Sequence, residues 1–209
     1  MIIPELIIPD KKDFFPTQRD FSETARYLGY KKLENPDEVT SQLIENCCKE
    51  LFEVINPKAA VKVFLLEKND LSTGQLIFAD VDFISKDLSR NLRDCKEVIL
   101  LAATIGPQVD STIRKNQIVN PVKAAIFQAA GAMFIEKFVD NVNLQIKKIV
   151  AEEEKQCKPR FSPGYGDVSL NLQKDFFRLL PCAKIGLTLM DTLIMSPEKS
   201  VTAFIGISE

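Results

Sequence analysis

The sequence predicts an α+β fold in which helices flank a mostly antiparallel or mixed sheet. Apolar residues recur at helical spacing along residues 121–153, which indicates one long amphipathic helix. Residues 79–83 alternate between apolar and acidic side chains, a pattern typical of a half-buried strand. Residues 97–104 include a continuous apolar run, which favours a buried central strand. Because helices and strands interleave without regular βαβ units, we expect α+β rather than a parallel α/β sheet.

The first 20 residues are predicted to be an irregular segment, since three prolines interrupt them. A short edge strand at Ile7 and Ile8 is the only regular structure expected there. The rest of the chain, residues 21–209, is predicted to form one domain. It begins with a short helix over residues 21–30, for which Ser22 is the expected N-cap.

The remaining elements are predicted from periodicity and from turn-forming residues. Alanine and glycine dominate residues 124–132 of the long helix, which permits close packing on a sheet; contact with a ligand or partner is the alternative. In chain order, we expect helix 37–55, strand 61–66, turn 69–74, strand 76–84, helix 85–92, strand 97–104, helix 108–115, helix 121–153, loop 160–167, helix 170–180, strand 185–189 and strand 200–207.

The composition argues against several classes of function. The net charge is −2, so there is no surplus of lysine and arginine to bind a nucleic-acid backbone. No apolar run reaches the roughly 20 residues needed to span a bilayer. The N-terminus also lacks the features of a signal peptide, and we therefore expect a cytoplasmic protein. The five cysteines form no C-x-x-C pair, and their odd number favours reduced thiols over a disulfide framework.

The chain contains no histidine, and this absence restricts the chemistry available to it. A Ser-His-Asp triad, an H-E-x-x-H zinc helix and imidazole as a general base are all excluded. No G-x-x-x-x-G-K-[ST] phosphate loop is present, and no G-x-G-x-x-G follows a strand. We therefore expect neither a catalytic side chain nor a metal ligand set.

Residues 160–167 concentrate side chains suited to binding a small charged molecule. Gly164 and Gly166 permit positive φ and close approach of backbone N–H groups. Arg160 offers a planar fork that can bind a carboxylate through two hydrogen bonds. Tyr165 offers a ring for stacking and a hydroxyl for hydrogen bonding. The set would suit a zwitterionic amino-acid ligand that carries an aromatic base, and a tight turn between two helices is the alternative reading.

The sequence R-F-S-P-G-Y-G-D at residues 160–167 resembles the Arg-x-x-Pro-Gly-Tyr loop of the methionine synthase activation (reactivation) domain family. Further stretches match that cobalamin-dependent family in order and spacing, and the similarity extends from about residue 20 to the C-terminus. They are residues 25–30, residues 102–110 (the family's A-A-T-x-G-P-x-V-D), residues 129–138, and residues 185–189 with 195–203. The resemblance implies a twisted, mostly antiparallel sheet flanked by helices.

The resemblance also implies a function and a set of contacts. In this family the loop holds S-adenosylmethionine, which remethylates a cobalamin cofactor after reduction by a flavodoxin- or ferredoxin-like electron donor. By analogy, Arg160 would fix the ligand's carboxylate, the glycines would allow backbone approach, and Tyr165 would line the pocket. The implied cofactor-binding residues are Arg160, Phe161, Ser162, Pro163, Gly164, Tyr165 and Gly166.

The chain lacks homocysteine-, folate- and cobalamin-binding regions and has no histidine to ligate cobalt. The resemblance therefore implies a stand-alone member of a methyltransferase system. The cobalamin would be carried by a separate corrinoid-binding methionine synthase or methyltransferase. Two alternatives remain open: a non-catalytic module that binds or caps a corrinoid protein without using S-adenosylmethionine, and an enzyme for an unrelated small molecule built on the same fold.

The sequence departs from the family pattern at three places. The loop continues as G-D-V-S at residues 166–169, where full-length methionine synthases have a stretch with cysteine and histidine. Phe204 or Ile205 stands where the family has a tyrosine in the last strand. The family's acidic residue that meets the ligand's amino group has three equal candidates here, Asp10, Asp13 and Asp20.

Overall fold

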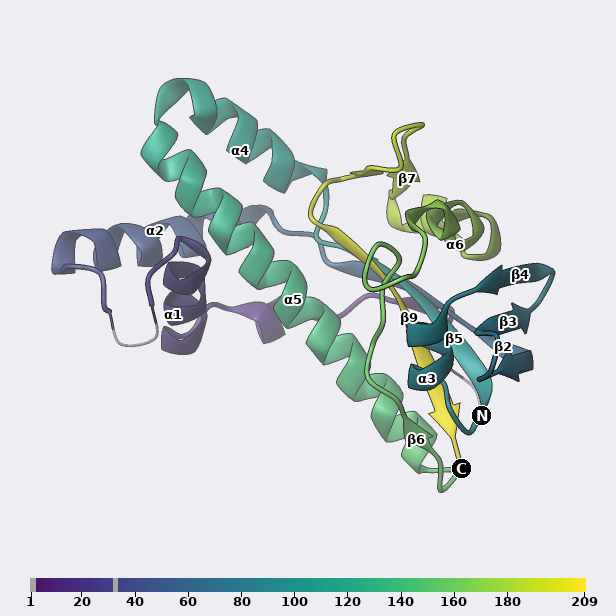
Figure 1. Ribbon diagram of the computed structural model, residues 1–209. Helices are drawn as coiled ribbons and strands as arrows, with labels where there is room; N and C mark the ends of the chain where they lie inside the picture. The colour runs from purple at the N-terminus through teal and green to yellow at the C-terminus, as the bar shows by residue number, and fades with distance from the viewer. Residues whose placement is uncertain (1–2, 32–33) are drawn as a thin grey trace.

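The computed structural model describes residues 3–31 and 34–209 and has an α+β fold (Figure 1). Its seven-stranded sheet has the order β4-β3-β2-β5-β9-β6, with β1 paired to β2, and every strand pair is antiparallel. The predicted fold class is therefore confirmed. The sheet strands are β1 (Leu6–Ile7), β2 (Lys58–Asp70), β3 (Gln75–Phe78), β4 (Val81–Ile84), β5 (Cys95–Thr104), β6 (Gln156–Cys157) and β9 (Ser200–Ser208).

Helices cover both faces of this sheet, and a small separate hairpin, β7–β8, lies near α6 (Figure 1). The α-helices are α1 (Gln18–Tyr27), α2 (Glu38–Val54), α3 (Lys86–Asn91), α4 (Pro107–Val119), α5 (Pro121–Ala151) and α6 (Gln173–Leu179). The 3-10 helices are η1 (Lys11–Phe14), η2 (Leu170–Leu172) and η3 (Cys182–Ile185), and the hairpin strands are β7 (Thr188–Leu189) and β8 (Met195–Ser196).

The two faces of the sheet carry two separate hydrophobic clusters. Along β5, Ile99 and Leu101 pack with α1, α2, α4 and α5, whereas Val98 and Leu100 pack with α3, α6 and the β3–β4 hairpin. All four side chains are fully buried. Because successive strand residues point to opposite faces, a strand covered on both sides must be apolar throughout, as the run at residues 97–104 predicted.

The small residues of α5 do allow close packing, and one of them accommodates a lysine. Ala130 is fully buried in the helical cluster. A Cβ built on Gly131 would lie 3.0 Å from Cε of Lys199, so glycine leaves room for the aliphatic part of that side chain. The helix begins at Pro121 and is capped by Asn120, whose side chain accepts a hydrogen bond from the backbone N–H of Lys123 at 3.1 Å.

The first helix starts earlier than the sequence suggested, and the prediction of Ser22 as N-cap was wrong. Helix α1 begins at Gln18 and its N-cap is Thr17. The backbone N–H of Thr17 donates to Oδ2 of Asp20 at 2.7 Å. This reciprocal capping by an acidic residue three positions into the helix fixes the start, and it leaves Ser22 inside the helix with its hydroxyl bonded to the carbonyl of Gln18.

Two predicted strands were also wrong in extent. Residues 76–84 form a hairpin rather than one strand, because Ala79 adopts a positive φ of 42° and reverses the chain. Residues 182–185 form η3, and Gly186 ends it with a φ of 73°, so only Thr188–Leu189 is strand in that region. Neither reversal carries the Asn-Gly or Asp-Gly pair that usually announces a tight turn.

Three features bear on other functions: membrane-spanning helices, metal sites and reactive thiols. No helix among the described residues is long and apolar enough to cross a membrane. Within residues 3–31 and 34–209, no group of three or more acidic or cysteine side chains could hold a metal ion. All five cysteines are free, and burial raises the pKa of Cys47, Cys48 and Cys182 to about 11, so these thiols are poor nucleophiles.

Candidate ligand-binding site

The loop at residues 160–168 is held at both ends and projects between them. Near its start, Phe161 and Phe204 of β9 exchange two backbone hydrogen bonds, of 3.0 and 2.7 Å. At its end, Val168 is buried in the cluster beneath α6. The backbone N–H of Gly164 donates to the carbonyl of Val168 at 2.9 Å, which closes the intervening turn. Gly164 and Gly166 have φ values of 89° and 53°, as predicted for positions that need glycine.

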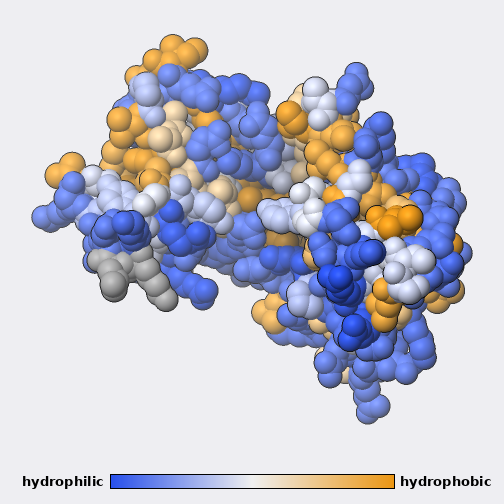
Figure 2. All heavy atoms as spheres, in the orientation of Figure 1, coloured by the Kyte–Doolittle hydropathy of each residue, from blue (hydrophilic) through white to orange (hydrophobic). Residues whose placement is uncertain are grey.

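A hollow of about 450 Å³ lies beside this loop. Tyr165 stands at its mouth with 70% of its surface exposed. Figure 2 shows that the molecular surface is notched between the end that carries α4 and the end that carries α6 and β7–β8. The hollow is lined by Glu136, Arg160, Phe161, Ser162, Pro163, Tyr165, Gln173, Met195, Ser200, Val201 and Thr202.

Arg160 is only partly engaged by the protein itself. Its Nη2 atom lies 2.9 Å from Oδ1 of Asp140 and 3.6 Å from Oε2 of Glu136, both on α5. Its Nη1 atom is buried and has no hydrogen-bond partner in the part of the chain that the structure describes. Leaving a buried charged donor unpaired costs about 1–3 kcal/mol or more.

The edge of β9 supplies backbone groups that sequence reasoning missed. The N–H and C=O of Phe204 point outward to Phe161, so those of Thr202, two residues earlier, point to the same edge. Among the described residues, no strand pairs with that edge at Thr202, which lines the hollow. The Thr202 hydroxyl is hydrogen-bonded to Oε1 of Gln173 on α6 at 3.1 Å. Thr202 is only 2% exposed, so this unpaired edge is largely covered by the surrounding side chains.

The three acidic candidates near the N-terminus do not line this hollow. Asp10 caps η1. Asp13 and Asp20 line a neighbouring hollow of about 600 Å³, and Asp20 is paired with Lys137 at 2.6 Å. Burial raises the pKa of Asp20, but hydrogen bonds from Lys137 and Thr17 outweigh it, so the net pKa lies below its usual value. Glu136 lines both hollows.

The acidic side chain closest to Arg160 is that of Asp140, on α5. Its signal in the sequence was the spacing of Glu136 and Asp140, four residues apart on one helix face.

Phe204 and Ile205 do not line the hollow either. Both are fully buried, and the Phe204 ring packs edge-on against Phe176 with centroids 4.7 Å apart.

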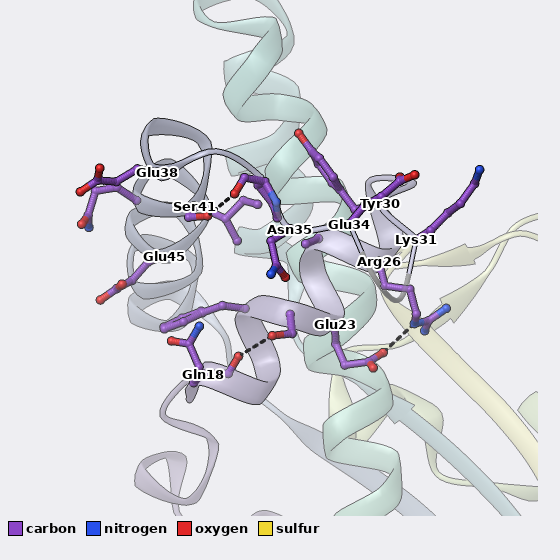
Figure 3. Close-up of a pocket in the computed structure, with 16 residues that line it drawn as sticks. Gln18, Glu23, Arg26, Tyr30, Lys31, Glu34, Asn35, Glu38, Ser41 and Glu45 are labelled. Carbon is purple, nitrogen blue, oxygen red and sulfur yellow. Dashed lines mark hydrogen bonds and ion pairs between the residues drawn. The ribbon is translucent and has the colours of Figure 1, made fainter.

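A larger hollow of about 740 Å³ lies between α1 and α2, and none of the predicted site residues lines it. Figure 3 shows that its charged side chains, such as Glu34, Lys31 and Glu45, come from both helices and the segment between them. Glu23 and Arg26 form an ion pair with each other, with N and O 2.8 Å apart.

The fold defines a class of protein. No protein-family model matches the sequence, and no curated protein matches it. Thirteen chains of solved structures match the fold. One is a crystal structure of the MetH reactivation domain bound to AdoHcy, with a TM-score of 0.66 and 14% sequence identity over 96% of this chain and 77% of the other. The chain therefore shares the fold of a MetH reactivation domain.

Proposed function

We propose that this chain is an S-adenosylmethionine-binding reactivation module, which supports reductive methylation of a cobalamin cofactor held by a separate methionine synthase or corrinoid methyltransferase. One observation carries the proposal: Arg160 lines a hollow of about 450 Å³, and among the described residues its guanidinium is paired only through Nη2. The fold-sharing MetH domain is bound to AdoHcy, the product form of this ligand, which supports the same conclusion.

The lining of the hollow suits each part of the ligand. Arg160 would bind the methionine carboxylate through its guanidinium, and Glu136 is the carboxylate available for the ammonium group. The backbone of Ser162 and Pro163 would flank the adenine, and Tyr165 would cover it. The implied set of residues 160–166 is thus proposed together with Glu136.

The chain's task in this proposal is orientation. Cobalamin, carried by the partner and reduced by a flavodoxin- or ferredoxin-like donor, would accept the methyl group. The chain itself would hold the sulfonium toward the open mouth of the hollow, which is a proximity effect and needs no acid, base or nucleophile. A chain without histidine is compatible with this work.

Calorimetric titration with S-adenosylmethionine and S-adenosylhomocysteine tests the proposal. Arg160→Ala should weaken binding by about ten- to a hundredfold, since a hydrogen bond to a charged group contributes roughly 1.5–3 kcal/mol. Arg178→Ala is the matched control, because Arg178 also pairs with two carboxylates, those of Asp80 and Asp175, but does not line the hollow. Equal affinities for wild type and Arg160→Ala would contradict the assignment.

A second candidate is a module that binds or caps a corrinoid protein without using S-adenosylmethionine. The pairing of Arg160 Nη2 with Asp140 favours it, because the guanidinium already has one internal partner. The same titration separates the two functions. Absence of binding heat from wild type with either ligand, at millimolar concentration, would leave the capping module.

A further inference from the structure

The loop that forms the proposed site is tied to a helix far away in the sequence. The carboxylate of Asp167 accepts hydrogen bonds from the first turn of α3: from the hydroxyl of Ser85, from the backbone N–H of Lys86 at 2.7 Å and from that of Asp87 at 3.2 Å. Ser85 and Asp167 are 82 positions apart. The contact therefore links the loop to a separate part of the sheet's cover.

Ser85 completes the link by serving two partners. Its hydroxyl donates to Asp167 and accepts from the backbone N–H of Leu88 at 3.0 Å, so the same oxygen caps α3. This Ser85 hydrogen bond, with those of the two backbone N–H groups, holds the pKa of Asp167 below its usual range. Asp167 is thus ionised at neutral pH, and its bonds are the stronger, charge-assisted kind.

Helix α3 is itself a fixed support. Leu88 and Leu92 at its inner face are buried in the core. At its C-terminal end, the side chain of Asn69 donates to the carbonyls of Ser89 and Leu92 at 3.1 and 3.0 Å. A group bonded to the first turn of this helix is therefore held in place relative to the sheet.

The loop also packs directly on α3 next to that link. A Cβ built on Gly166 would lie only 2.5 Å from Oδ2 of Asp87, so a side chain there would require the Asp87 carboxylate to move aside. On its other side the loop is fixed by the Phe161–Phe204 bridge. Only residues 162–166 lie between these two attachments, and they include Tyr165 and the two glycines of the proposed site.

We infer that Asp167 is a positioning residue, which holds the loop in its ligand-binding conformation through Ser85 and the first turn of α3. The inference rests on the proposed function. Asp167 does not line the hollow and touches no ligand group; it acts through the loop. Without its three hydrogen bonds the loop would be held on this side only by Val168, and the ligand would have to order the loop as it binds.

Asp167→Asn tests this role, because asparagine has nearly the same shape without the negative charge. Asp70 offers a matched control elsewhere in the chain. Its carboxylate accepts from the Ser72 hydroxyl at 2.6 Å, from the Ser72 N–H at 2.9 Å and from the Thr73 N–H at 3.2 Å, in the β2–β3 turn. It makes the same kinds of bonds away from the hollow.

Affinity for S-adenosylhomocysteine, measured by calorimetry, and stability in urea should be measured for wild type, Asp167→Asn and Asp70→Asn. We expect both variants to lose similar stability, but only Asp167→Asn to bind about tenfold more weakly or worse. Hydrogen exchange at the Gly164 and Val168 amides should speed up in Asp167→Asn alone.

The outcomes separate this inference from the proposed function. Wild-type binding with no loss in Asp167→Asn would overturn the positioning role and leave the proposed function standing. An equal loss of affinity in Asp70→Asn would also overturn it, since the effect would then follow from stability alone. If wild type binds no S-adenosylhomocysteine, the proposed function fails, and the inference fails with it.

Discussion

The two faces of the sheet are covered by different kinds of element. One face is covered by α1, α2, α4 and the 31-residue α5, whose apolar stripes pack into a single large cluster. The other is covered by short helices and long connections (Figure 1). Polar contacts join distant segments on both faces, such as Asp20 with Lys137 on the first. On the second face, Asp167 with Ser85 and Thr202 with Gln173 involve the segments that line the hollow or carry its loop.

This difference indicates what each face contributes to a binding site. The proposed site lies where the two meet, since Arg160 pairs with α5 and the rest of its loop is bonded to α3 and β9. Apolar burial is non-directional, so it determines stability more than the position of any one atom. Hydrogen bonds are directional, and they can place a loop within the tolerance that binding requires.

A cavity on the helical face should produce the largest loss of stability. Phe138 on α5 is fully buried, and Phe138→Ala should lower the free energy of unfolding by about 3–5 kcal/mol. Leu144→Ala on the same helix is the control; Leu144 is half exposed, so its loss should stay within about 0.5 kcal/mol. Urea denaturation measures both. A small effect at Phe138 would show that this face does not depend on burial as described.

Backbone strain at Gly166 should lower the free energy of unfolding less than the cavity at Phe138 does, but it should also weaken ligand binding. Gly166→Ala places a side chain at a φ of 53° and within 2.5 Å of Asp87, so we expect about 1–2 kcal/mol of destabilisation and weaker ligand binding. Gly186→Ala is the control, since Gly186 has a φ of 73° with no atom within 4 Å of a Cβ. If both variants bind alike, contact of the loop with α3 has no part in recognition.

The sequence predicted the helical face better than the other. The apolar stripe of α5 recurs with the helical period along the 31 residues of the helix, so its type and extent could be inferred. On the second face, the reversals at Ala79 and at residues 182–185 depend on positive φ and on tertiary contacts that no local pattern announces. Tertiary context decided the structure there.

Within the candidate site, too, local sequence predicted some features, whereas others depend on tertiary contacts. The glycines and Arg160 could be singled out from local chemistry, and both glycines do have positive φ. The link from Asp167 to Ser85 spans 82 positions, and the stretch of β9 left unpaired at Thr202 depends on where β6 and Phe161 pair with that strand. Such contacts arise only when the chain has folded, so a single sequence gives no direct signal for them.

Removing an internal competitor for Arg160 should change binding in the opposite direction to removing Arg160. Asp140→Asn weakens the 2.9 Å ion pair with Nη2, so the guanidinium becomes freer to bind a ligand carboxylate. Since Asp140 is mostly exposed, we expect a gain in affinity of only a few fold, the equivalent of about 0.2–1 kcal/mol. Asp80→Asn, which affects Arg178 instead, is the control. Weaker binding by Asp140→Asn would mean that Asp140 positions Arg160 rather than competing for it.

The smallest expected effect is the pH dependence of the stability that Asp167 contributes through its hydrogen bonds to Ser85 and the first turn of α3. The pKa of Asp167 lies below its usual value of 3.8, chiefly because Ser85 donates a hydrogen bond to it. A carboxyl whose pKa is lowered by folding contributes its full stability above the unfolded pKa and loses it as pH falls through the folded pKa. The difference in stability between wild type and Asp167→Asn should therefore be constant from neutral pH to about 5 and shrink below about 4.

Urea unfolding from pH 7 to pH 3 measures this difference directly. Because asparagine does not titrate, subtracting the variant removes the contributions of Asp20, Asp37 and Asp70, whose pKa values are also lowered. A difference that stays constant down to pH 3 would show that the charge of Asp167 does not strengthen its bonds to α3. The loop would then be held by shape and main-chain contacts, and the contrast between the two faces would rest on packing alone.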